Sequence, residues 1–209
     1  MARITKAPEE RRLEIVQTAE RLFREVGYAK CSVEMIIQRI GIAKGTFYYY
    51  FKSKEAILEA IADQTLGQIV EYAKDIADNP SLSALAKFET LLTNSHVGNV
   101  DTQDISDILH LPENRELHEL TNVKSVLQLS PIFAKIVSQG NQEGVFAADR
   151  PLARIQYVFV ATQFLLDGGL FQFSDQEIRE RREIAQELIE KTLGAAPGSF
   201  DFMNPTLES

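Results

Sequence analysis

The residues best suited to bind another molecule lie close together between positions 44 and 54. They are tyrosines and lysines with one threonine and one glycine among them: Lys44, Gly45, Thr46, Tyr48, Tyr49, Tyr50, Lys52 and Lys54. Tyrosine hydroxyls and lysine ammonium groups bind phosphates, and lysine and threonine side chains reach base edges. A glycine lets the backbone come close to a partner. This set of residues predicts contact with nucleic acid.

Two short helices that meet at a tight turn are predicted to position these side chains. Apolar residues at three- and four-residue spacing predict one helical face, formed by Val33, Ile36, Ile37 and Ile40. Gly41 follows at once, where a residue with positive φ can end a helix. A second apolar set can close onto the first: Ile42, Phe47 and Phe51. In such a helix-turn-helix the second helix enters the major groove of DNA. The alternative is a short amphipathic hairpin within some other helical domain.

The same stretch resembles the signature of the TetR family of ligand-responsive transcriptional regulators, most of which are repressors. The matching residues are Gly27, Tyr28, Ser32, Val33, those at 41–48, those at 51–55, and Leu58. Ala43 departs from the family pattern, which has Ser or Thr there, so the second helix lacks a side-chain oxygen at its N-cap. Cys31 stands where Thr is usual, although Ser32 can cap the first helix. Ile37 and Ile40 stand where alanine is usual, and we expect slightly wider helix spacing.

The resemblance implies an all-α fold with an N-terminal helix-turn-helix three-helix DNA-binding domain and a C-terminal helical domain for ligand binding and dimerisation. We expect these domains at 1–53 and 54–194, followed by a loosely ordered tail at 195–209. The expected contacts to base edges are Lys44, Gly45, Thr46 and Tyr49. The expected contacts to phosphates are Ser32, Tyr48, Tyr50 and Lys54.

The charge distribution supports a division into two functional parts. The whole chain has a net charge of −8. Residues 1–54 hold eleven Lys and Arg against six Glu, a net charge of +5, whereas the remainder holds eleven against 24 acidic residues, a net charge of −13. A basic N-terminal part on an acidic remainder suits a protein that meets phosphates at one end only.

Composition and motifs exclude several other classes of protein. Hydrophobic residues make up 44% of the chain, without an apolar run long enough for a membrane span or a signal peptide, so we expect a cytoplasmic protein. No phosphate-binding glycine loop, GxSxG, HExxH or paired CxxC motif is present, and we expect no enzyme activity, cofactor or metal. Cys31 is the one cysteine, and it is either a small packing residue or a redox sensor.

Apolar periodicity predicts helices through the rest of the chain. The expected ranges are 9–26, 54–77, 81–95, 101–109, 113–129, 131–140, 152–170 and 174–193. Pro131 is expected to break or kink the path. The last two helices resemble the pair that forms a four-helix bundle with a second copy in the TetR family; alternatively, both fill the core of a monomer. The expected dimer contacts are Val158, Leu165, Ile178, Ala185, Leu188 and Ile189.

The chain is therefore interpreted as a homodimeric repressor that a small, largely apolar ligand releases from a palindromic operator. A two-fold pair of recognition helices would read half-sites about 34–36 Å apart. The candidate ligand-binding residues are His110, Phe133, Phe159 and Phe164, each of which could equally belong to an ordinary core or surface. The alternative function is a ligand-independent architectural or protein-interaction module associated with DNA.

Overall fold

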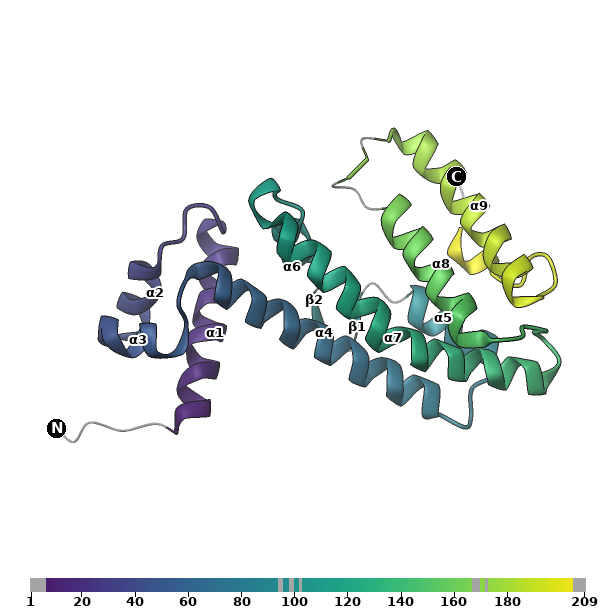
Figure 1. Cartoon of the computed structure of the whole chain (residues 1–209), viewed down its shortest axis with the longest axis horizontal. Helices are drawn as coiled ribbons and strands as arrows, with labels where there is room; N and C mark the ends of the chain where they lie inside the picture. Colours follow the sequence, from purple (N-terminus) through teal and green to yellow (C-terminus); the bar gives the residue numbers. More distant parts are fainter. Residues whose placement is uncertain are drawn as a thin grey trace.

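The computed structural model describes residues 7–93, 96–97, 100–101, 103–166, 170–171 and 173–204. It confirms the all-α fold; the only described strands are the short antiparallel pair β1 His96–Val97 and β2 Val100–Asp101. Figure 1 shows a small head at one end, a larger helical body at the other, and the long helix α4 running from one into the other.

The bounds of the helices agree with the predicted ranges except at α5, α7 and α8. They are α1 Pro8–Val26, α2 Val33–Ile40, α3 Lys44–Tyr50, α4 Lys54–Asp78, α5 Ala84–Thr93, α6 Gln103–Leu109, α7 Arg115–Glu143, α8 Pro151–Leu165 and α9 Asp175–Leu193. Two 3-10 turns, η1 Pro112–Asn114 and η2 Asp201–Met203, stand before α7 and after α9.

The apolar core of the head extends beyond α1, α2 and α3. Ile15, Ile36 and Phe47 are fully buried in it, and Ile57 and Leu58 from the first turns of α4 are buried with them. Two residues of α6 close the same core: Ile105 and Leu109. The head is therefore completed by residues on the far side of the expected boundary at 53, so α4 cannot move without disturbing it.

A second core fills the body and contains the other half of α4. Leu66, Val70 and Ala73 of α4 pack there against α5, α7, α8 and α9. Phe88 of α5 is its aromatic centre, with ring centroids 5.4 Å from Phe133, 5.8 Å from Phe146 and 5.2 Å from Phe200. Because α4 is buried in both cores, it connects them mechanically.

Polar ties also hold α4 against its neighbours. Lys124 of α7 donates a hydrogen bond of 2.6 Å to Asp63 of α4, and Lys135 pairs with Asp78 eleven residues further along α7. The buried Lys87 of α5 donates to the Ala77 carbonyl at 2.6 Å, near the C-terminus of α4. A lysine at this end satisfies a carbonyl that has no partner within the helix.

Pro131 does not break the chain path, so the expected break is wrong, whereas the expected kink stays a prediction. α7 runs through it as one helix and ends at Gly144, whose φ of 76° is left-handed. Pro131 is exposed, whereas its neighbours Ile132 and Phe133 are buried in the body core. One lost helical hydrogen bond is therefore outweighed by tertiary packing on the opposite face.

α8 is shorter than expected. It ends at Leu165, where the Leu166 amide donates to the Thr162 carbonyl at 2.9 Å. Residues 167–169, which the predicted helix 152–170 included, lie outside the described part of the chain. The predicted helix is too long because apolar residues continue past Leu165, the last helical residue.

The expectation of a loosely ordered tail is wrong for residues 195–204. Phe200 is fully buried in the body core, and its amide donates to the buried Glu190 carboxylate at 3.1 Å. Asn204 adds a hydrogen bond of 2.8 Å to Gln186. The tail folds back onto α9 because one aromatic ring fills the gap beside Phe88. Residues 205–209 lie outside the described chain.

Candidate functional site

The turn between α2 and α3 forms as the residue types predict. The Ser32 hydroxyl caps α2 by accepting from the Met35 amide at 3.2 Å. Gly41 ends α2 with a φ of 73°, and its amide donates to the Ile37 carbonyl at 2.9 Å. Ala43 precedes α3 without a side-chain cap. The expected helix-turn-helix is therefore confirmed as local structure.

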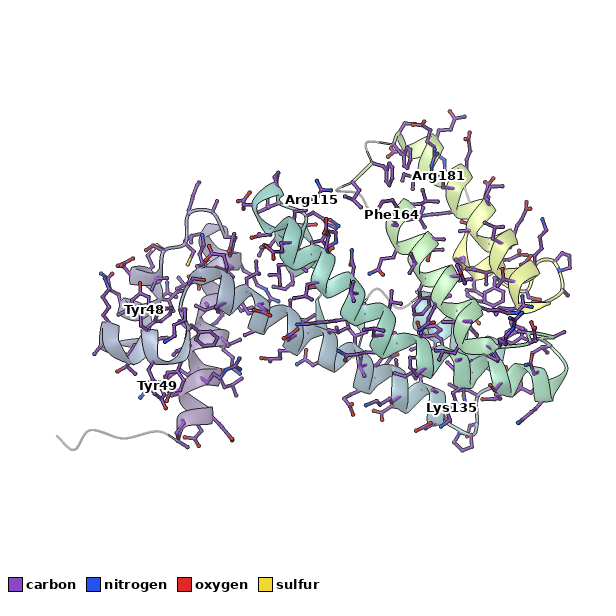
Figure 2. All side chains as sticks on the ribbon, in the orientation of Figure 1. Tyr48, Tyr49, Arg115, Lys135, Phe164 and Arg181 are labelled. Carbon is purple, nitrogen blue, oxygen red and sulfur yellow. The ribbon has the colours of Figure 1, made fainter. Side chains whose placement is uncertain are left out.

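α3 has one buried and one exposed face. Phe47 is fully buried and anchors it to the head core. On the opposite side Lys44 and Gly45 are exposed, and Tyr49 is 75% exposed. A Cβ built on Gly45 would meet nothing within 4 Å, so the backbone there is open to a partner. Tyr48 and Tyr49 lie at the end of the molecule farthest from α8 and α9 (Figure 2).

Thr46, Tyr48 and Tyr50 of α3 are partly packed against neighbours and partly exposed. The Tyr48 ring stands edge-on to Phe47 at 5.4 Å, and the Tyr50 ring stands edge-on to Tyr49 at 5.0 Å. Both rings and Thr46 are half-buried. Lys44 forms an exposed ion pair of 3.7 Å with Glu34, which costs little to break. These tyrosines can therefore present hydroxyls while their rings are held by neighbours.

Lys54 is already engaged within the head. Its ammonium donates to the Tyr28 carbonyl at 2.9 Å and lies 4.0 Å above the Tyr28 ring. This contact ties the first residue of α4 to the loop before α2. An ammonium has three N–H donors, so a phosphate contact by Lys54 stays a prediction beside this observed structural role.

Two side chains in the loop before α2, Tyr28 and Cys31, are buried in the head core. Burial raises the pKa of Tyr28 to about 12, and its buried hydroxyl has no hydrogen-bond partner among the described residues. Burial also raises the pKa of the Cys31 thiol, which points to the Ser32 carbonyl at 3.8 Å. Because thiol reactivity requires an accessible thiolate, this setting favours packing over a redox role for Cys31.

At the other end, α8 and α9 share an apolar exposed face, here called the α8/α9 face. It has a hollow of about 450 Å³ lined by Val158, Ala161, Thr162, Leu165, Leu166, Glu180, Arg181, Ile184, Ala185, Leu188 and Ile189. Five of the six predicted dimer residues lie on it, and Ile178 does not. Ile184, which the sequence analysis missed, is 53% exposed beside Leu188 at 54%. The i, i+4 spacing of Ile184 and Leu188 is the sequence pattern that could have placed Ile184 on this face.

Comparison with known families agrees with this two-ended architecture. Residues 15–61 match the family described as bacterial regulatory proteins, tetR family, and residues 96–188 match the tetracyclin repressor-like C-terminal domain. The chain belongs to the TetR family. Members of this family regulate transcription and are not enzymes, as the sequence analysis expected.

Individual relatives match over most of this chain. The uncharacterized regulator YerO of Bacillus subtilis is 29% identical over 178 residues, 81% of this chain and 61% of YerO, so the chain spans less than two thirds of it. The fatty acid metabolism regulator of Bacillus subtilis is 30% identical over 63% of this chain and 69% of its own. A TetR/AcrR regulator from Thermobifida fusca superimposes with a TM-score of 0.57 at 25% identity, covering 94% of this chain and 98% of that one.

The four ligand residues predicted for this TetR chain do not come together. The ring centroids of Phe133 and Phe159 lie 4.9 Å apart in an edge-to-face arrangement, and Phe133 is buried in the body core. Phe164 is exposed on α8. His110 lies 4.6 Å from His118, between α6 and α7. Ligand binding by these four residues stays a prediction, because aromatic content alone does not separate core rings from pocket rings.

A different hollow lies where the head core meets the body core, and we call it the junction hollow. It measures about 140 Å³ between α4, α6 and α7. Its lining is Ala62, Thr65, Leu66, Ile69, Ile105, Ser106, Leu109, His118, Thr121, Asn122 and Ser125. The lining residues on α4 and those on α7 are far apart in the sequence, so no local sequence pattern marks this hollow.

The described residues contain neither a candidate metal cluster nor a helix that could span a membrane. None of their His, Cys, Asp and Glu side chains gather in threes in a way that could hold a metal ion. None of the helices they form is both long enough and apolar enough to cross a bilayer.

Proposed function

We propose that this TetR-family chain is a sequence-specific DNA-binding repressor that acts as a homodimer on a palindromic operator. The observation that carries the proposal is α3, which presents Lys44, Gly45 and Tyr49 at the outer end of a basic head. DNA binding is assigned to residues 1–53 and the ligand and dimer functions to 54–194. This activity requires access to the chromosome, so the proposed location is the cytoplasm.

The proposed contacts divide between bases and phosphates. Lys44, Gly45, Thr46 and Tyr49 would meet base edges; this is supported by the open backbone at Gly45 and the exposed Tyr49 ring. Ser32, Tyr48, Tyr50 and Lys54 would hold phosphates. The Ser32 hydroxyl uses a lone pair in capping α2 and keeps its hydrogen for a phosphate oxygen.

Dimerisation would use the α8/α9 face. A monomer that exposes Leu165, Ile184 and Leu188 side by side leaves an apolar patch in water, which marks a protein interface. A two-fold axis at this face would place two heads on successive major grooves about 34–36 Å apart. Two short recognition helices can then read enough bases for specificity.

Release would follow from a small, largely apolar effector in the body. α4 belongs to both cores, so a ligand that changes its packing also changes the position of the head. The junction hollow lies against α4, α6 and α7 and is the proposed effector site in place of the Phe133 and Phe159 region. The effector can shift the equilibrium only by its differential affinity for the two states.

Selection from a randomised DNA pool tests the proposal. We expect a palindrome that outcompetes bulk DNA by about 10³-fold or more. Thr46→Ala is expected to alter the selected sequence, whereas Tyr48→Phe weakens binding to all sequences equally. Binding without sequence preference by a full-length dimer would instead favour a ligand-independent architectural protein.

A further inference from the structure

We infer that the junction hollow takes a compact, uncharged ring compound that carries a hydrogen-bond donor, such as a phenol. The inference rests on the proposed function, since it specifies the effector class of the same site. Three features of the hollow support it: its volume, the lack of Asp, Glu, Lys and Arg among its described lining residues, and the orientation of its hydroxyl groups.

The volume limits the ligand to one ring. A cavity of about 150 Å³ is known to accept a single benzene molecule. The junction hollow is of similar size, at about 140 Å³. Five apolar residues line it and would contact the faces of a ring: Ala62, Leu66, Ile69, Ile105 and Leu109. A long chain or a polycyclic compound would extend out of the hollow into solvent.

Among the described residues of the lining there is no Asp, Glu, Lys or Arg, and His118 is the one ionisable side chain. An ionised ligand would therefore lose its hydration without gaining an opposite charge, which is costly. Beside the hollow, Lys124 and Asp63 neutralise one another across α7 and α4 at 2.6 Å. The neighbouring hollow of about 240 Å³ differs, since it includes Arg115, and an anion would prefer that site.

The hydroxyl groups of α7 select a donor on the ligand. Thr121 donates its hydroxyl hydrogen to the Leu117 carbonyl at 2.8 Å, and Ser125 donates to the Thr121 carbonyl at 2.9 Å. Their oxygens keep lone pairs but have no hydrogen left to give. A ligand O–H or N–H can use these lone pairs, while the hydroxyls of Thr65 and Ser106 in the same lining can donate to a ligand oxygen, so a phenol O–H group suits both.

Asn122 links the polar wall of the hollow to α8. Its side chain lies 3.2 Å from the His118 ring nitrogen and accepts from Gln163 of α8 at 2.8 Å. Asn122 lines the junction hollow and also the shallow groove between α7 and α8. A ligand that engages Asn122 therefore acts on a residue that is bonded to the helix of the proposed dimer face.

Binding of one-ring probes to the full chain without DNA tests the inference. The probes are 4-fluorophenol, fluorotoluene, fluorobenzoate and fluorobenzylamine, each followed by fluorine NMR and by the melting temperature. We expect the phenol to bind tightest and, at ten times its Kd, to raise Tm by about 3–5 °C. Tighter binding of the benzoate or the amine would overturn the inference, and so would failure of all four to bind.

Two pairs of matched variants locate the site. Ser125→Ala removes a lone-pair acceptor and is expected to weaken phenol about tenfold with little effect on fluorotoluene. Ser138→Ala is the control, because Ser138 makes the same bond to the carbonyl four residues earlier on α7, at 2.9 Å, away from the hollow. Ile69→Trp should fill the hollow and abolish binding, while Ile76→Trp, two turns along α4, should not. Equal affinities within both pairs would overturn the assignment.

Operator binding, measured separately, distinguishes this inference from the proposed function. If a palindrome is bound but no probe enters the hollow, the effector class is wrong and the DNA-binding function stands. If phenol binds with the expected variant pattern, the class is supported even where DNA binding fails.

Discussion

The Lys54 ammonium lies 4.0 Å above the Tyr28 ring while it donates a hydrogen bond to the Tyr28 carbonyl. This contact joins the start of α4 to the loop between α1 and α2. A desolvated cation over an aromatic face contributes about 1–2 kcal/mol. This contact adds to the burial of Ile57 and Leu58 in the head core, and together they position α4 relative to the head.

Tyr28→Phe is expected to leave stability at pH 7 unchanged or to raise it by about 1 kcal/mol. The substitution keeps the ring under Lys54 and removes a buried hydroxyl that has no partner among the described residues. Urea denaturation measures the change, and Tyr28→Leu, which loses the ring, should cost about 1–3 kcal/mol. A loss above about 1 kcal/mol in the Phe variant would show that the hydroxyl is bonded.

The wild type and Tyr28→Phe should also differ in how their stability depends on pH. Burial raises the pKa of Tyr28 from an ordinary 10.0 to about 12. The neutral hydroxyl is therefore favoured in the folded state; its contribution to stability is complete below pH 10 and is lost as pH rises toward 12. Between these values the wild type should lose stability faster than Tyr28→Phe.

Gly45→Ala separates folding from DNA contact. The added methyl meets no atom within 4 Å, and alanine is the better helix former, so stability should rise by about 0.5–1 kcal/mol. If the backbone of α3 approaches DNA closely, the same methyl should weaken operator binding about tenfold or more. Fluorescence anisotropy with the selected operator measures this. Unchanged affinity would remove Gly45 from the interface.

Leu188→Glu is expected to convert the proposed dimer into a monomer. Leu188 is 54% exposed on the α8/α9 face, and a charge there would be buried without a partner on association. Light scattering during size-exclusion chromatography gives the mass. Leu92→Glu on α5, where Leu92 is 42% exposed outside that face, is the control and should leave the mass unchanged. A dimeric Leu188→Glu variant would move the interface elsewhere.

Gly140→Ala and Gly67→Ala should have opposite effects on stability. A Cβ at Gly140 would overlap the ring of Phe146, a member of the buried aromatic group around Phe88. Overpacking of this kind costs about 1–3 kcal/mol. Gly67 lies in α4 with nothing within 4 Å of an added Cβ, so alanine should stabilise by about 0.5–1 kcal/mol. Denaturant titration of both variants measures the difference.

Glu177→Gln tests the capping box of α9. The Ser174 backbone amide and then its hydroxyl hold the pKa of Glu177 below the ordinary 4.5. A depressed carboxyl pKa gives stability that is present above pH 4.5 and is lost as pH falls through the lower folded value. The Gln variant should therefore show a shallower loss of stability below pH 4.5. Glu183→Gln, an exposed change on the same helix, is the control.

The head was predictable because its determinants are local. Ser32, Gly41 and Phe47 lie within sixteen positions of one another, and each acts on its own or the adjacent helix. Cap, turn and buried anchor all agree, so a short stretch specifies both the shape of the site and its exposed face.

The proposed effector site was not predictable for the opposite reason. The junction hollow is made by Thr65 on α4, Ser106 on α6 and Asn122 on α7, which come together only after the body has packed. Periodicity identifies each apolar face but not its partner. Likewise, nothing in the spacing around Phe200 distinguishes a ring in a tail from one in a core, and the cost of Pro131 depends on packing that sequence alone does not reveal.

The burial of Phe200 affects the order in which the head core and the body core can fold during translation. The fully buried residues of the head core end at Leu109, and its last packed neighbour is Leu117 early in α7, so the head can fold while most of α7 is still being synthesised. The body must wait, because its aromatic centre lacks a ring until residue 200 emerges. We therefore expect the head of a nascent chain to fold before the α8/α9 face is complete.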